Sequence, residues 1–582
     1  MKAKLSFLAG MLLAAQPIAL SIGAAPAAAQ TQQLLNYPAI HQPVVGEGGM
    51  VVSQNQVAST IGARILKQGG NAVDAAVATA FALAVVLPRA GNLGGDGFML
   101  IHLADGDRNI FIDYRSVAPL ASRPEMFLDS RGKENEAASL GYKAPSVPGT
   151  VAGLHLAQRK YGALPWAKVV QPAIDLAENG IVLSQDEAWV FTWAHDRLQT
   201  SEAGKRAFFK PDGSFYKAGE TWRQPVLAAT LRAIRAGGAD ALYKGTLARR
   251  FAADMAAHGG LITEADLAAY KAVERIPLVG SYRGHAIVTA PPASAGGVTI
   301  LEALNILEHF DLKSKGAGSA AELHLVAEAL RLANSDRYRF VGDTDFVKVP
   351  LKGLTSKDYA ADRAKLIDPD KAMAASRDNA GEPLRYESPN TTHFSVADGK
   401  GNSVSNTFTL GADFGSGVMV DGLGFLLNNQ MNNFSHEQAL KARASGGPLP
   451  ANTMAPGKRM LSTMVPTFVL KDGKPWLITG SPGGSTIIGT VVQTLVDVLD
   501  FDLNIAEATH IPRIHEAGGD TIELEPNFNP DTSRLLVEMG HKVKPSQTMG
   551  STQSIVIESG KFLGAADPRR PGAMAVSVDS LR

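Results

Sequence analysis

The sequence has 582 residues, of which 45% are hydrophobic and 19% charged, so it can bury a large core and is not expected to be disordered. Its 56 Lys and Arg residues balance 56 Asp and Glu residues, which gives no electrostatic reason to expect nucleic acid or an anionic membrane as a partner. The absence of cysteine excludes disulfides, thiolate nucleophiles and Cys-ligated metals.

The first 29 residues have the pattern of an export signal. Lys2 and Lys4 precede an apolar run over residues 5–22, and a stretch of small residues ends in Ala27-x-Ala29. This order predicts a signal peptide, residues 1–29, and hence a periplasmic or secreted protein. An uncleaved anchor is the alternative, but the polar residues that follow favour cleavage. No other stretch is long and apolar enough to span a bilayer, so we expect no stable membrane insertion.

The next segment predicts a buried helix, a glycine-rich loop and a strand. Asn71 and Asp74 form a helix-start pattern, and residues 75–87 are apolar. Loop 91–97 then leads into strand 98–103. Because the order is helix, loop, strand, the loop does not match a dinucleotide-binding turn, in which the strand comes first.

Apolar residues recur at helical spacing between Leu323 and Ala333, which predicts a helix with one packing face. Arg331 and Arg337 lie off this stripe, and we expect both to face solvent. The thirteen histidines include no HExxH pair, and no serine lies in a GxSxG elbow. The commonest metalloprotease and α/β-hydrolase sites are therefore not indicated.

Two β-rich runs joined by residues 398–402 predict a β-hairpin. Pairing Ala397 with Ser403 in an antiparallel ladder places Thr391 opposite Thr409. We therefore expect the two hydroxyl groups to meet.

A second strand pair, 465–470 and 476–479, precedes the glycine-rich loop 480–484 and an apolar helix over 485–499. A loop of this kind at a helix start presents free N–H groups and the positive end of the helix dipole, which suits an oxyanion or a carboxylate. Taken alone, the segment is equally well explained as a plain strand-to-helix turn.

Several segments together resemble the γ-glutamyltransferase family of N-terminal-nucleophile (Ntn) hydrolases. They are residues 70–76, 91–97, 113–115, 148–153, 391–393, 428–430, 480–484 and 550–554. The resemblance implies a four-layer αββα sandwich made as an inactive precursor. It further implies a cut between Asn390 and Thr391, giving a large subunit, 30–390, and a small catalytic subunit, 391–582, which remain together as a heterodimer.

By this resemblance Thr391 is the nucleophile, although its position in the sequence would otherwise indicate an ordinary strand residue. A threonine hydroxyl needs a base, and a free α-amino group with a pKa of about 7.7 to 8.0 is such a base at neutral pH. Cleavage before Thr391 creates that base on the nucleophile itself.

The resemblance assigns further residues to the site. Thr409 would hydrogen-bond near the nucleophile, and the N–H groups of Gly483 and Gly484 would form the oxyanion hole. The positions that hold the α-carboxylate of the γ-glutamyl group correspond to Arg115, Ser462 and Thr463. Without the resemblance, these three would be read as a surface salt bridge and a polar turn.

The sequence departs from the family where the donor's α-ammonium group binds. Family members usually use Asn, Gln and Asp, and the matching positions here are Gly411, Gln430 and Asn433. Replacing the carboxylate by an amide removes the direct counter-charge, and a hydrogen bond to a charged group contributes about 1.5 to 3 kcal/mol. We therefore expect γ-glutamyl donors to bind less well than in a typical member.

Three functions remain open. The first is a hydrolase and transpeptidase that acts on glutathione or related γ-glutamyl amides, with water or an amine as acceptor. The second is an acylase on the same scaffold, acting on glutaryl groups of the cephalosporin type, which Gly411 and Asn433 favour. The third is a non-catalytic binding protein, against which Thr391, Thr409 and the two glycines argue. No cofactor or metal is implied.

Overall fold

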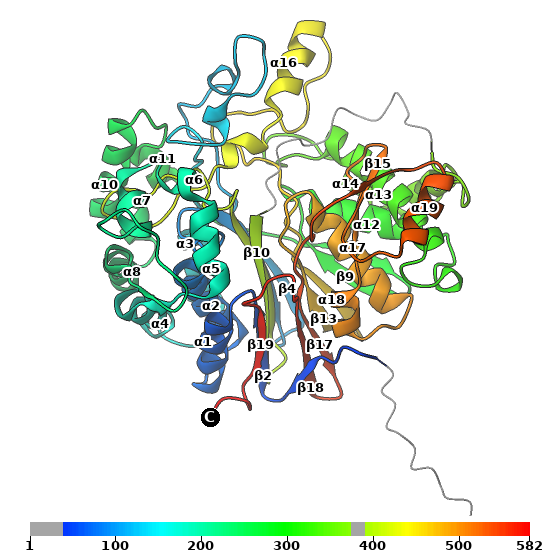
Figure 1. The fold of residues 1–582 in the computed structure, drawn as a ribbon, viewed down its shortest axis with the longest axis horizontal. Helices are drawn as coiled ribbons and strands as arrows, with labels where there is room; N and C mark the ends of the chain where they lie inside the picture. The colour runs from blue at the N-terminus through cyan, green and yellow to red at the C-terminus, as the bar shows by residue number, and fades with distance from the viewer. Residues whose placement is uncertain (1–38, 374–389) are drawn as a thin grey trace, which may run out of the picture. The chain divides into compact units, whose positions relative to one another are not determined.

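The computed structural model describes residues 39–373 and 390–582, so the predicted signal peptide lies outside the described residues. The chain divides into a segment, 1–40, and a unit formed by 41–582, to which every element below belongs. At the centre of this unit are two seven-stranded antiparallel sheets (Figure 1).

The first sheet contains the predicted hairpin at its middle. In spatial order its strands are β19 (Met574–Ser577), β2 (Gly49–Ser53), β10 (Asn390–Asp398), β11 (Ser403–Gly411), β3 (Asp96–Leu103), β4 (Arg108–Asp113) and β7 (Val273–Arg275). Strand β10 is therefore paired on both sides.

The second sheet contains the predicted second strand pair. Its strands, in order, are β1 (Val44–Gly46), β18 (Lys561–Ala566), β17 (Gln553–Glu558), β13 (Lys474–Thr479), β12 (Thr467–Lys471), β9 (His285–Thr289) and β8 (Leu278–Tyr282). Thr467 pairs with Thr479 across the β12–β13 hairpin.

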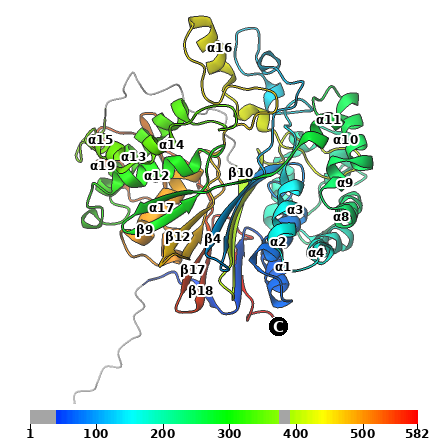
Figure 2. The same ribbon diagram turned by 180° about the vertical axis from the view of Figure 1, so that it is seen from behind.

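Helices lie on the outer side of each sheet (Figures 1 and 2). Those beside the first sheet include α1 (Gln56–Lys67), α2 (Ala72–Val86) and α3 (Thr150–Tyr161). Those beside the second sheet include α12 (Gly296–Leu307), α13 (Ala320–Phe340), α17 (Thr486–Leu499) and α19 (Pro530–Glu538). The expected mixed α/β architecture built on two large sheets is thus present.

The predicted early helix is α2, and its start follows the expected pattern. The Asn71 side chain accepts the N–H groups of Val73 and Asp74, and the Asp74 carboxylate accepts the Asn71 N–H in return. All residues of α2 are buried, because it lies between α1 and the first sheet on one side and α3 and α4 (Trp166–Asn179) on the other.

The predicted exposure of Arg331 and Arg337 is wrong, since each is only 2% exposed. Helix α13 packs against α12, α19 and β14 (Ile514–His515), so more than one of its faces is covered. The Arg331 guanidinium is held in this interior by Glu328 at 3.3 Å and by the Met373 carbonyl at 2.8 Å. A single apolar stripe does not reveal a helix buried on several sides.

Within the described ranges, no helix combines the length and the apolar character that crossing a bilayer requires.

Candidate active site

The start of β10 faces the second sheet. Alternate residues of a strand share one face, and Ser395 on this face donates to the Gln553 carbonyl of β17 at 2.7 Å. Farther up the same face, a Cβ added to Gly480 would lie 2.5 Å from the His393 ring. Strand β10 therefore runs directly beneath the glycine-rich loop that follows β13.

Thr391 and Thr409 meet as the sequence predicts, although the ladder between them is irregular. The expected register holds from Ala397–Ser403 to Thr392–Phe408, and it then shifts so that Asn390 pairs with Gly411. The Thr391 hydroxyl donates to Thr409 Oγ1 at 3.3 Å, and the Gly411 N–H donates to the same oxygen at 2.8 Å. The irregularity lies at the proposed nucleophile itself.

The glycine-rich loop has a backbone conformation that favours glycine and leaves N–H groups free among the described residues. Gly483 has a φ of 129° and Gly484 a φ of 57°, a region that favours glycine, and a Cβ on Gly483 would lie 2.3 Å from Thr486 Oγ1. The Gly483 carbonyl accepts the Thr486 N–H at 3.1 Å. Among the described residues, neither the Gly483 nor the Gly484 N–H donates to a protein acceptor.

One pocket brings together nearly all the residues that the sequence proposes. It is lined by Arg115, Thr391, Thr409, Gly411, Gln430, Asn433, Ser462, Thr463, Met464 and Gly484. Of the proposed site residues, only Gly483 and Asn390 are not in its lining. Asn390 and Thr391 both belong to β10.

Arg115 is part of the pocket lining and forms a buried ion pair. Its Nη1 lies 2.7 Å from Asp96 Oδ1, and Arg115 and Asp96 are 1% and 0% exposed. Nε and Nη2 donate to the carbonyls of Met460 and Leu461 at 3.2 and 3.0 Å. Three of the five guanidinium N–H donors are therefore occupied by described residues, and each terminal nitrogen keeps one N–H for a ligand.

Gln430 and Asn433 lie at the two ends of a short 3-10 helix and contact each other. Asn433 Nδ2 donates to Gln430 Oε1 at 2.6 Å, and Gln430 Nε2 donates to Asp96 Oδ1 at 3.4 Å. Asn452 Nδ2 donates to the Asn433 carbonyl at 2.6 Å. The residues that sequence comparison assigns to the ammonium group are thus linked to Arg115 through one carboxylate.

Gly411 leaves no room for the amide that family members usually carry there. Its φ is 95°, and an added Cβ would lie 2.1 Å from Asn429 Oδ1. That oxygen accepts the Ala412 N–H at 2.9 Å. The Asn429 side chain therefore occupies the space next to Gly411.

Ser462 and Thr463 lie in the segment before β12 and close the pocket beside the glycine loop. Thr463 Oγ1 donates to the Gly484 carbonyl at 2.8 Å, which ties this segment to the glycine-rich loop. Ser462 Oγ accepts the Met464 N–H at 3.1 Å. Both hydroxyls therefore have structural partners in addition to any ligand.

Asp96 is not among the residues that the sequence proposes for the site. Thr409 of β11 pairs with Asp96 of β3 in the sheet, so this carboxylate lies one strand away from the paired threonines. The available signal was an acidic residue inside the 91–97 glycine-rich loop, a segment that contributed only to the resemblance.

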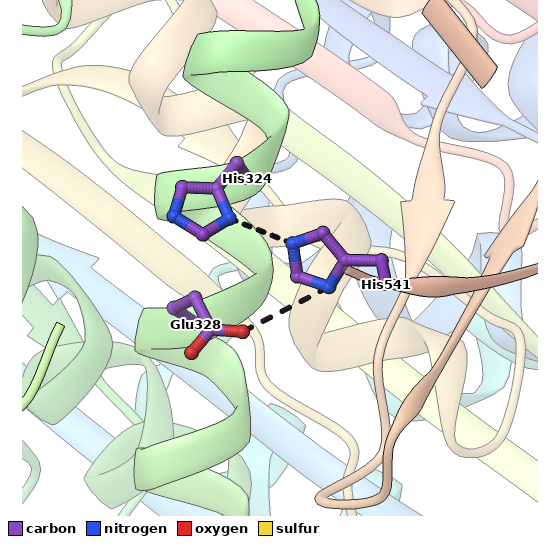
Figure 3. Close-up of side chains that lie close together, drawn as sticks. All are labelled: His324, Glu328 and His541. Atoms are coloured by element: carbon purple, nitrogen blue, oxygen red, sulfur yellow. Dashed lines mark hydrogen bonds and ion pairs between the residues drawn. The ribbon is translucent and has the colours of Figure 1, made fainter. Parts of the chain in front are cut away.

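A cluster of His324, Glu328 and His541 is the one group of metal-ligand type among the described residues (Figure 3). His324 Nδ1 lies 2.7 Å from His541 Nε2, whereas two imidazole ligands of a tetrahedral zinc ion would be about 3.3 Å apart. Burial raises the pKa of Glu328 and lowers those of both histidines, that of His541 to about 3. This short contact indicates a hydrogen bond between the two imidazoles rather than a metal centre.

Comparison with known proteins agrees with this geometry. The family model described as Gamma-glutamyltranspeptidase matches residues 58–577. The chain is 47% identical to the glutathione hydrolase proenzyme of Escherichia coli strain K12, with 96% of each chain covered. It is 39% identical to the Acylase ACY 1 proenzyme of Pseudomonas sp. strain SE83, covering 91% of this chain and 94% of that one. The crystal structure of cephalosporin acylase from Bacillus halodurans superposes with a TM-score of 0.83 at 31% identity, covering 94% and 98% of the two chains.

Fold and pocket together define an Ntn-hydrolase scaffold of the type shared by γ-glutamyltransferases and cephalosporin acylases. The chain belongs to the gamma-glutamyltranspeptidase family.

Proposed function

We propose that the protein is a self-processing γ-glutamyltransferase, or glutathione hydrolase, that cleaves γ-glutamyl amides through a γ-glutamyl ester on Thr391. The observation that carries the proposal is the single pocket shared by Thr391, Thr409, Arg115 and Gly484. It combines the hydroxyl nucleophile of Thr391, the Thr409 hydroxyl that accepts a hydrogen bond from it, a cation that can bind a carboxylate, and an N–H donor for an oxyanion. The 47% identity to a glutathione hydrolase proenzyme supports the same substrate class.

Maturation and turnover would use the same attacking atom. Thr391 Oγ1 attacks the Asn390 carbonyl, and the C–N bond of the peptide breaks as an ester forms, which frees the Thr391 α-amino group. Water then hydrolyses the ester and releases the Asn390 carboxylate and the Thr391 hydroxyl. The products are a large subunit, 30–390, and a small subunit, 391–582, which stay together as a heterodimer in a four-layer αββα sandwich. Two sheets shared by strands from both segments support a lasting association.

In turnover, Thr391 Oγ1 attacks the γ-carbonyl of the donor while the free α-amino group takes the hydroxyl proton. The N–H groups of Gly483 and Gly484 stabilise the resulting oxyanion, and loss of one such donor typically costs about 3 to 4 kcal/mol. The proton passes to the departing amine as the tetrahedral intermediate collapses to the ester. Water, or the amine of an amino acid or peptide, then attacks the ester and regenerates Thr391.

A glutaryl acylase is the second candidate. Asn433 offers the pocket an amide rather than a carboxylate, and Gly411 offers no side chain. Segment 435–456, which by the family resemblance corresponds to a substrate lid, has no Phe, Tyr or Trp, and this would admit a bulkier leaving amine. The likeness to a cephalosporin acylase supports this candidate, whereas the higher identity to a glutathione hydrolase supports the first.

The deciding experiment compares kcat/KM of the purified, self-cleaved enzyme for γ-glutamyl-p-nitroanilide and glutaryl-p-nitroanilide. We expect the γ-glutamyl donor to be preferred. A glutaryl preference would reassign the protein to acylase chemistry, and no turnover of either donor by a cleaved protein would favour a binding role.

Export to the periplasm or beyond is part of the proposal and is supported by the N-terminal pattern alone. Fractionation of the source cells, with N-terminal sequencing of the large subunit, tests it. Mature protein that begins before residue 30 and remains in the cytoplasm would contradict it.

A further inference from the structure

Asp96 is a fully buried carboxylate that does not line the pocket but contacts two residues that do. Its Oδ1 accepts from Arg115 Nη1 at 2.7 Å and from Gln430 Nε2 at 3.4 Å. Its Oδ2 accepts from the Ser116 N–H at 3.2 Å and from the Ser116 hydroxyl. Both oxygens are thus occupied, and the carboxylate is fixed between the residue proposed for the donor's α-carboxylate and one proposed for its α-ammonium group.

The charge of Asp96 changes what the pocket selects. Arg115 alone would favour an acyl group with a net negative head, such as glutaryl. The γ-glutamyl head carries one carboxylate and one ammonium group and has no net charge. Because Asp96 neutralises Arg115 in a water-excluded setting, where charge interactions are strong, the pair should favour the zwitterionic head.

The other charged residues near the Arg115–Asp96 ion pair form ion pairs with one another. Asp113 Oδ1 accepts the Arg115 backbone N–H at 2.9 Å, while its Oδ2 lies 2.7 Å from Arg275 and 3.4 Å from Arg459. Arg275 also pairs with Asp345 at 2.7 Å. Among the described residues that line the pocket, Arg115 is the only charged one, and Asp96 is its counter-charge.

Asp96 also determines how the two amides are oriented. An ionised carboxylate only accepts hydrogen bonds, so the Gln430 NH₂ group must face Asp96 and its oxygen must face Asn433. Asn433 in turn donates its NH₂ group to that oxygen. The side-chain oxygen Oδ1 of Asn433 is then left as an acceptor, which is what an ammonium group needs.

We propose that Asp96 is a specificity-determining residue that acts through Arg115 and Gln430, supplies the negative charge that Asn433 lacks, and favours the zwitterionic γ-glutamyl head over anionic acyl heads. This inference rests on the proposed acyl-transfer function. Asp96 is a positioning residue, because it reaches the donor only through its two partners.

The test is the isosteric variant Asp96→Asn, which keeps an oxygen for Arg115 and removes the charge. We expect the ratio of kcat/KM for γ-glutamyl-p-nitroanilide to that for glutaryl-p-nitroanilide to fall at least tenfold. Part of the fall should come from a gain on the glutaryl donor, which damage to the fold cannot produce. Equal losses on both donors would overturn the proposal.

Ser116→Ala is the matched control, because it removes a hydrogen bond to the same carboxylate and leaves the charge. We expect its ratio to stay within about threefold of the parent, because Asp96 keeps its charge and its contacts with Arg115 and Gln430. The double variant Asp96→Asn/Asn433→Asp returns the charge at the neighbouring position and should recover the γ-glutamyl preference. Failure to recover it would contradict the charge argument.

If Asp96→Asn is not self-cleaved, competitive inhibition of the unaltered enzyme tests the same inference. L-glutamate and glutarate should both compete with the donor, and we expect glutamate to inhibit at a concentration at least tenfold lower. Glutarate that inhibits as strongly as glutamate would overturn the inference. Absence of all turnover would instead contradict the proposed function.

Discussion

Thr409 holds the hydroxyl of Thr391, and it is itself held by the backbone of its own strand. Thr391 Oγ1 donates to Thr409 Oγ1 at 3.3 Å, and the Gly411 N–H donates to that same oxygen at 2.8 Å. Thr409→Val keeps the shape and removes the acceptor. Because a neutral hydrogen bond contributes about 0.5 to 1.5 kcal/mol, we expect kcat to fall about two- to tenfold or more. Thr409→Ser should retain most of the rate, and a fully active valine variant would show that this contact is not used.

Thr391→Ala should abolish both the cut and the activity, because one oxygen performs both attacks. Gel electrophoresis should show a single chain for Thr391→Ala and two chains of about 38 and 20 kDa for the parent, scaled from 61.3 kDa for 582 residues. Thr391→Ser is the matched control and should be cut, at a lower rate. Turnover by an uncut Thr391→Ala protein would remove Thr391 from the mechanism.

Asn433→Asp should raise γ-glutamyl turnover relative to glutaryl turnover. The new carboxylate would lie next to Gln430 Oε1, to which Asn433 now donates at 2.6 Å, and would be available to a donor's ammonium group. A charged hydrogen bond of about 1.5 to 3 kcal/mol corresponds to a change of roughly ten- to a hundredfold. The kcat/KM ratio for the two anilides measures it, and an unchanged ratio would show that residue 433 does not contact the ammonium group.

The hairpin, the capped helix and the identity of the pocket residues could be predicted, because each depends on local pattern or on the family resemblance. The antiparallel pairing of the predicted hairpin was enough to place Thr391 opposite Thr409. The shift of register at Asn390–Gly411 could not be foreseen, since a bulge depends on what packs around it.

The role of Asp96 could not be read from the sequence either. Its partners are 19 and 334 positions away in the chain, and only the pairing of β3 with β11 and the path of the 428–433 segment bring them together. The predicted exposure of Arg331 and Arg337 was wrong for a similar reason, because the elements that cover α13 come from several distant segments. Long-range packing of polar groups leaves little trace in local periodicity.

Hydrogen bonds in the His324, Glu328 and His541 cluster should hold segments of the two proposed subunits together. His324 Nε2 donates to the Asp368 carbonyl at 2.8 Å, so its Nδ1 accepts from His541 Nε2. His541→Leu leaves that buried acceptor without a donor and should cost about 1 to 3 kcal/mol of stability, measured by urea unfolding. His541→Gln, which can still donate, should lose less.

Because two imidazoles of this cluster are in hydrogen-bond contact, we expect that the enzyme needs no metal ion bound between its three side chains. Dialysis against EDTA should change neither the unfolding midpoint nor kcat. A chelator-induced loss of stability, together with one equivalent of zinc in the untreated protein, would reverse this interpretation.

The last prediction concerns acid stability and His393, which lies under the glycine-rich loop. Burial lowers the pKa of His393 to about 3, from about 6.5 in an unfolded chain. Between these two values the unfolded state binds a proton that the folded state does not, so stability falls as the pH falls through this window. One such group contributes up to about 1.4 kcal/mol per pH unit.

His393→Asn should therefore flatten the dependence of the urea-unfolding midpoint on pH between 6 and 4, even if it lowers stability at pH 7. Burial likewise lowers the pKa of His541 to about 3 and that of His515 to about 4, so some acid sensitivity should remain. His195→Asn, at a half-exposed position, is the control for the substitution itself. If the two variants have the same pH dependence, protonation of His393 does not contribute to the loss of stability at low pH.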